Sequence, residues 1–107
     1  MVMLRPGQTQ RVYFDDQFLM VSAVKTVGKA YWVWVRAMPV GADGSITGAG
    51  AEIEVAVENT PEVEIVPGQR VELVEPYLRA SEILTRRRDP VLRFHALGVR
   101  PVGQIAN

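Results

Sequence analysis

The sequence predicts an all-β fold, a small antiparallel barrel of five or six strands with at most one short helix. Three observations predict this class. Segments of strand length are rich in β-branched and aromatic residues, apolar and polar residues alternate within several of them, and turn-forming residues separate them. The 107 residues are enough for one domain. A closed barrel is favoured because it leaves no unpaired strand edges.

Two strands are expected within the first forty residues. Residues 11–26 form the first, with Asp15 and Asp16 marking a turn or bulge inside it. Residues 30–38, with the sequence AYWVWVRAM, form the second. Alternate side chains of a strand point to opposite faces of a sheet. One face of the second strand therefore carries Tyr31, Val33 and Val35, and the other carries Trp32, Trp34 and Arg36.

Either face of this second strand can be the one that packs in the core. Burying a tryptophan removes roughly 150–250 Å² from water, which favours a core built on the two tryptophans. The charge of Arg36 on the same face favours the opposite arrangement, in which Val33 and Val35 are buried. The sequence leaves both arrangements open, and only the second gives a candidate binding surface.

A glycine-rich loop and an amphipathic strand follow. Residues 41–50 contain four glycines, a composition that favours a flexible loop. Residues 51–59 alternate regularly between apolar and acidic side chains. This pattern predicts a half-buried strand. The side chains expected to point inward are Ile53, Val55 and Val57, and those expected to point outward are Glu52, Glu54 and Glu58.

Two further strands are expected over residues 62–66 and 70–78. Pro67 and Gly68 lie between them and suit the two central positions of a type II turn. This turn either closes a hairpin or leads directly into the next strand.

The last segment combines a charged stretch with a final strand. Good helix formers fill residues 80–88, so this stretch is either a short helix or part of a basic loop over residues 79–90. Pro90 would end such a helix. Residues 91–102 are expected to form a strand that bends at Gly98.

Charge is balanced overall but is distributed unevenly along the chain. Residues 1–36 carry five basic and two acidic residues, and residues 37–69 carry six acidic and no basic residues. Residues 70–107 carry seven arginines and four acidic residues. This distribution fits either solvated faces of different charge or a basic surface suited to an anion such as nucleic acid.

The sequence offers little for catalysis or metal binding. It has no cysteine and one histidine, His95, and none of its serines lies in a nucleophile-elbow pattern. The glycine patterns of phosphate-binding loops are absent. We therefore expect no enzymatic activity, no cofactor and no metal site. Because no apolar run reaches the roughly 18 residues of a membrane span and no signal peptide is recognisable, we expect a cytoplasmic protein without a membrane partner.

The C-terminal third combines a glycine turn, a strand, a basic loop and a final strand. Gly68 precedes a strand of the form G-x-x-V-x-V, in which Val71 and Leu73 are the apolar positions. The final strand carries alternating apolar residues, namely Leu92, Phe94, Ala96 and Val99. This arrangement resembles the end of an OB-fold domain of the single-stranded-DNA-binding and primosomal type.

The resemblance implies a groove in which bases stack on aromatic rings and arginines contact phosphates. Here the stacking platform would be Trp32 and Trp34, with Arg36 beside them. The phosphate contacts would come from Arg79, Arg86, Arg87, Arg88 and Arg93. The implied function is non-catalytic binding of single-stranded nucleic acid, DNA rather than RNA, with little sequence preference. Glu52 and Glu54 would repel phosphates if they flanked this groove.

The alternative is a structural or interaction module, such as a phage or plasmid component, that forms a homo-oligomer. The acidic segment 52–64 of one copy would then face the basic segment 79–93 of the next, with exposed tryptophans as interface anchors. One departure from the OB pattern keeps this alternative open. Residues 58–68 leave no room for the helix that bacterial single-stranded-DNA-binding proteins usually carry between their third and fourth strands.

Overall fold

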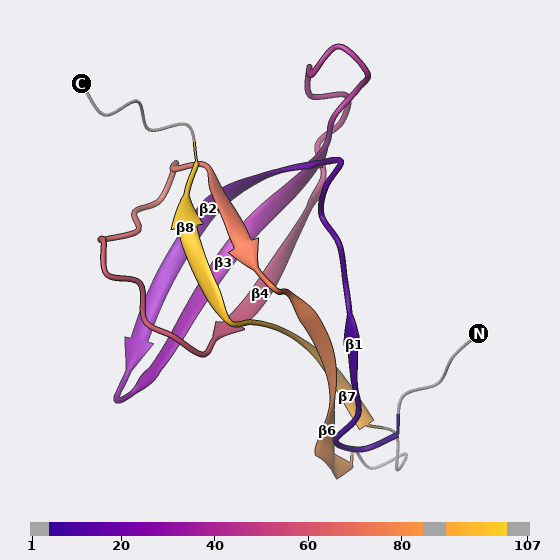
Figure 1. Cartoon of the computed structure of the whole chain (residues 1–107), viewed down its shortest axis with the longest axis vertical. Helices are drawn as coiled ribbons and strands as arrows, with labels where there is room; N and C mark the ends of the chain where they lie inside the picture. The colour runs from indigo at the N-terminus through magenta and orange to yellow at the C-terminus, as the bar shows by residue number, and fades with distance from the viewer. Residues whose placement is uncertain (1–4, 85–89, 103–107) are drawn as a thin grey trace.

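The chain folds into eight β-strands (Figure 1). The computed structural model describes residues 5–84 and 90–102, with backbone only at 82–84 and 90. The strands are β1 (Thr9–Arg11), β2 (Gln17–Val27), β3 (Ala30–Pro39), β4 (Ala51–Val57), β5 (Val71–Val74), β6 (Tyr77–Leu84), β7 (Pro90–Ala96) and β8 (Gly98–Pro101). Within these ranges there is no helix, and so none that is long and apolar enough to cross a membrane.

The strands form two sheets that do not close into a barrel. Six strands make one sheet in the order β1-β6-β7-β4-β3-β2, and β5 pairs with β8 in the other. The prediction of an all-β fold is confirmed, whereas the closed antiparallel barrel is wrong. The two edge strands, β1 and β2, lie at opposite ends of the large sheet, and the β4–β7 pair is parallel. Between β4 and β7 the chain runs through residues 58–70, β5 and β6, and β7, which is antiparallel to β6, lies beside β4 in the same direction.

A single long hairpin contributes to both sheets. β5 and β6 form one arm and β7 and β8 form the other. Val74 pairs with Gly98 and Tyr77 pairs with His95, so the register of the two arms is the same before and after the bend between these pairs. The bend lies where Glu75 adopts a positive φ of 46° in one arm, and it faces the break before Gly98 in the other. The expected bend at Gly98 is therefore confirmed, and it carries the hairpin from the small sheet into the large one (Figure 1).

Two expected elements differ from the structure. Residues 62–66 form a loop rather than a strand, although Ile65 within it is buried. Residues 80–84 belong to β6 rather than to a helix, because Ala80 is fully buried opposite Leu92 and this pairing outweighs local propensity. The turn before β5 has the expected type II features, since Gly68 has a φ of 88° and the Gln69 amide donates to the Val66 carbonyl.

The loop of residues 41–50 extends from the end of the β3–β4 hairpin (Figure 1). It folds back on itself through backbone hydrogen bonds. The Gly41 amide donates to the Ser45 carbonyl at 2.8 Å, and the Thr47 amide donates to the Pro39 carbonyl at 2.9 Å. The loop is therefore a hydrogen-bonded excursion between two strands.

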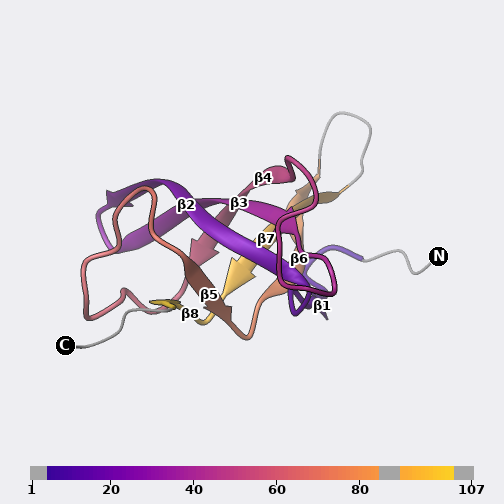
Figure 2. The same cartoon turned by 90° about the horizontal axis from the view of Figure 1, so that it is seen from above.

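The core lies between the two sheets, where β5 and β8 cover one face of β2, β3 and β4 (Figure 2). A β-bulge between Val21 and Ala23 lets the apolar positions of β2 stay on this face. The core is formed by Leu19, Val21, Tyr31, Val33, Val35, Val55, Val57, Ile65, Val71, Ala96 and Val99. The valine face of β3 is therefore the buried one.

The opposite face of the large sheet, which we call the outer face, carries the remaining alternating residues. Trp32, Trp34 and Arg36 lie on it and are half-buried. On β4 the expected pattern is confirmed, because Val55 and Val57 are buried while Glu52 and Glu54 are exposed on the outer face. The tryptophans are thus outside the core, and the outer face is the candidate functional surface.

Candidate nucleic-acid interface

Residues from all six strands of the large sheet form a row across the outer face. Directly paired residues of neighbouring strands project from the same side of a sheet. Following the pairs from β2 to β1 gives the first row, which consists of Lys25, Trp32, Ala56, His95, Tyr77 and Arg11. This row combines aromatic rings with Lys25 at one end and Arg11, which is ion-paired with Glu75, at the other, and none of its six members is a carboxylate.

A second level of the outer face lies next to the first row. On β2, β3 and β4 it consists of Ala23, Trp34 and Glu54. On β7, β6 and β1 it consists of Arg93, Arg79 and Thr9. The two tryptophans therefore lie on adjacent levels of one strand, and the two arginines lie on the paired strands of the bent hairpin.

Arg93 links the hairpin to the tryptophan strand. Its guanidinium carbon lies 5.4 Å from the centre of the Trp32 ring. β4 separates the two strands, and its residue in the first row is Ala56, whose methyl group leaves space for the arginine to reach across. A cation over an indole face is favourable, and this contact keeps positive charge directly beside the tryptophan.

A second aromatic group occupies the other half of the first row. The rings of Tyr77 and His95 stack with centres 5.2 Å apart and planes inclined by 10°. The Tyr77 hydroxyl donates a hydrogen bond of 3.0 Å to Oε1 of Glu58. This bond orients the tyrosine, while stacking orients the histidine.

The surroundings of this ring pair shift the pKa values of both groups. Burial, followed by the positive charges of Arg79 and Arg93, lowers the pKa of His95, against a smaller opposing effect of Glu58. Burial raises the pKa of Tyr77, and its hydrogen bond to Glu58 acts in the same direction. Both rings are therefore held in their uncharged forms near neutral pH.

Acidic residues occupy the part of the outer face nearest the 41–50 loop. Nη2 of Arg36 lies 3.8 Å from Oε2 of Glu52, and Nη1 of Arg36 donates to the Ala49 carbonyl at 3.3 Å. Glu54 is exposed directly opposite Trp34 on the neighbouring strand. Both carboxylates that the sequence marks as unfavourable for phosphates therefore lie on the outer face, outside the first row.

The structure brings most of the sequence-predicted site residues together. Trp32, Trp34, Arg36, Arg79 and Arg93 share the outer face. Arg86, Arg87 and Arg88 lie outside the described residues. The sequence reasoning missed Lys25, Tyr77 and Arg11, because their place in the first row depends on strand pairing between distant segments.

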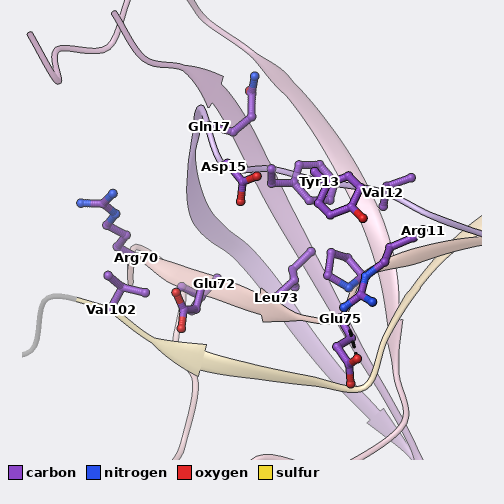
Figure 3. Close-up of a pocket in the computed structure, with 13 residues that line it drawn as sticks. Arg11, Val12, Tyr13, Asp15, Gln17, Arg70, Glu72, Leu73, Glu75 and Val102 are labelled. Atoms are coloured by element: carbon purple, nitrogen blue, oxygen red, sulfur yellow. Dashed lines mark hydrogen bonds and ion pairs between the residues drawn. The ribbon is translucent and has the colours of Figure 1, made fainter. Parts of the chain in front are cut away.

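A cavity lies away from the outer face, between residues 11–17 and β5 (Figure 3). Its volume is about 390 Å³. Among its lining side chains, Nη2 of Arg11 lies 3.2 Å from Oε1 of Glu75, and Glu72 is paired with Arg100. The lining holds no histidine, cysteine, serine or lysine.

Comparison with protein-family models, with curated proteins and with solved structures gave no match to this chain. Within the described residues, the outer face and this cavity are two candidate surfaces for a function. Of the two, the outer face joins aromatic rings to exposed cations. It is the better candidate for binding a ligand that is both planar and anionic.

Proposed function

We propose that this domain binds single-stranded nucleic acid on the outer face, without catalysis and with little sequence preference. The observation that carries the proposal is the pair of half-buried tryptophans, Trp32 and Trp34, on a sheet face that the second sheet leaves uncovered. Stacking on an aromatic side chain is worth roughly 1–3 kcal/mol per base and tolerates any base. Two adjacent rings therefore supply affinity without sequence readout.

The charge distribution favours one path for the bound strand. The first row has Lys25 at one end and Arg93 beside its centre, whereas Arg11 at the other end is paired with Glu75 and Tyr77 is hydrogen-bonded to Glu58. We therefore expect the phosphates to follow the Lys25 and Arg93 part of the row, away from Glu52. Arg36 contributes less than the sequence suggests, because Glu52 already neutralises its charge.

A fluorescence titration tests the proposal directly. The chain has two tryptophans, both on the outer face, so intrinsic emission reports on the site alone. We expect a short oligo-thymidine to quench this emission at low salt, and added salt to reverse the effect. Each phosphate neutralised contributes a slope of about −0.7 in log affinity against log salt, so three cations give about −2. An oligonucleotide that leaves both emission and its own anisotropy unchanged contradicts the proposal.

Variants separate stacking from charge. Replacing both tryptophans, W32L with W34L, is expected to weaken binding of a labelled oligonucleotide at least roughly thirtyfold, since two stacked bases contribute about 2–6 kcal/mol. The matched control is Tyr13→Leu, which removes an aromatic ring that is 71% exposed and lines the cavity instead. Glu54→Gln is expected to tighten binding, because it removes a negative charge beside Trp34.

The same measurements address the interaction module. If association depends on protein concentration, resists salt and is abolished by the tryptophan variants without any response to oligonucleotide, the outer face is an interface between protein copies. A double variant that unfolds, judged by circular dichroism and urea denaturation, would instead mean that the tryptophans stabilise the fold more than their position outside the core indicates.

A further inference from the structure

We propose that a nucleobase binds in the space above Ala56, between His95 and Trp32, so that the Tyr77–His95 pair is a second stacking platform. This inference rests on the proposed function and adds a defined subsite to it. It also assigns a role to three residues of the first row that the sequence did not connect with binding.

The pairing of strands creates this space. Trp32 and His95 lie on β3 and β7, and only β4 runs between them. Strands in a sheet are 4.7–4.9 Å apart, so the two backbones are separated by roughly 10 Å. The residue of β4 at the same level is Ala56, which is partly exposed and whose side chain is a single methyl group. The floor between the two rings is therefore low.

The histidine ring presents one face to this space. Its opposite face is stacked on Tyr77, which lies on β6, the neighbouring strand away from β4. Because the two ring planes are nearly parallel, the remaining face of His95 is turned toward β4 and Ala56. The tyrosine hydroxyl, held by Glu58, keeps the pair from turning.

Arg93 makes the subsite suitable for a nucleotide rather than for an uncharged aromatic ligand. Its guanidinium lies against Trp32 within the same space. An entering base displaces this guanidinium toward the phosphate of the same nucleotide, exchanging a cation–π contact for an ion pair.

The decisive variant fills the space without replacing any ring or cation. Ala56→Ile introduces a residue of high strand propensity at an outer-face position and places a branched side chain where the base would lie. We expect it to weaken binding of the oligo-thymidine by about tenfold or more, the effect of losing one stacked base. Ala56→Ser is the matched control, and its binding is expected to stay within about twofold of the original.

Variants of the histidine supply an independent readout. His95→Ala is expected to weaken binding, and His95→Phe to restore it, because phenylalanine can stack in the same place. The groups that face His95 are Tyr77 and Arg79 from β6, Glu58 after β4, and Arg93 from its own strand. It is the only histidine of the chain and its pKa is lowered, so the tighter oligonucleotide binding expected when it gains a proton should develop below pH 6.5. His95→Phe is expected to lose this dependence.

The outcomes distinguish the subsite from the function on which it rests. If Ala56→Ile is folded and binds as tightly as the original, the subsite is refuted, while loss of binding in the double tryptophan variant still supports the outer face. A folded His95→Ala variant that binds as tightly as the original would refute the subsite as well. If neither the original nor any variant binds oligonucleotide, the proposed function itself fails.

Discussion

Gly50 is the glycine whose replacement is expected to cost the most stability. It ends the 41–50 loop and precedes β4, with a φ of 72°. A Cβ added there would lie 2.1 Å from the Ala37 carbonyl oxygen and 2.9 Å from the Met38 Cα. Both are backbone atoms of β3, an interior strand of the large sheet. The clash therefore cannot be relieved by rotating a side chain.

The size of the effect follows from these contacts. Bringing the Cβ to an ordinary contact of 3.4 Å requires β3 and the start of β4 to separate by more than 1 Å, although Ala37 and Ala51 are paired there. Overpacking of this kind costs roughly 1–3 kcal/mol. The left-handed backbone adds roughly 1–2 kcal/mol, and the lower entropy of the unfolded chain returns roughly 0.4–1 kcal/mol. We expect Gly50→Ala to lose about 3 kcal/mol.

Gly44 provides the matched control for this prediction. Its φ of 84° is equally unfavourable for alanine, but no atom lies within 4 Å of the added Cβ. Gly44→Ala should therefore lose only about 1 kcal/mol or less. Urea denaturation of both variants, with unchanged m-values, gives the difference. A difference between the two variants below about 1 kcal/mol would show that the close approach of Gly50 to β3 is absent in solution.

Two further predictions concern the bent hairpin. Glu75 has a positive φ, so Glu75→Gly should be more stable than Glu75→Ala by about 1 kcal/mol in urea denaturation. Both variants lose the exposed ion pair to Arg11, but only alanine keeps the backbone strain. Equal stabilities of the two variants would contradict this. His95 has a lowered pKa in the folded protein, so the unfolded chain binds its proton first as the pH falls through 6.5. Stability should fall from pH 7.5 to 5.5 more steeply in the original than in His95→Phe, and parallel urea midpoints would contradict this.

Burial is predicted most reliably from the sequence when the residues of a single strand alternate between apolar and polar. In residues 51–57 each apolar residue is separated by a polar or small one, and the structure buries Val55 and Val57 as this period requires. In residues 30–36 the same period separates the two faces but does not say which is buried. That choice depends on β5 and β8, which cover the valine face and are about forty residues or more away in sequence.

Strand pairing between segments that are distant in sequence is the feature that the sequence predicts least well. Nothing local in residues 80–84 indicates a strand, because their helical propensity is overridden by pairing with β7. The parallel pairing of β4 with β7 likewise depends on how distant segments pack together, and no local pattern indicates it. As a result the tryptophans and arginines could be named as candidate binding residues, whereas the alignment of Trp32 with Lys25 and Tyr77 in one row could not be predicted.

The bend in the hairpin explains why one face of the large sheet remains free. Before the bend, Val71 and Val99 pack onto β2, β3 and β4 and seal the core. After the bend, the same two arms lie beside β4 and extend the sheet itself, which adds His95 to the level of Trp32 and Arg93 to the level of Trp34. A straight hairpin could do only one of these, since it would either cover the valine face or extend the sheet. The positive φ of Glu75 and the break before Gly98 therefore connect the stability of the core to the assembly of the outer face.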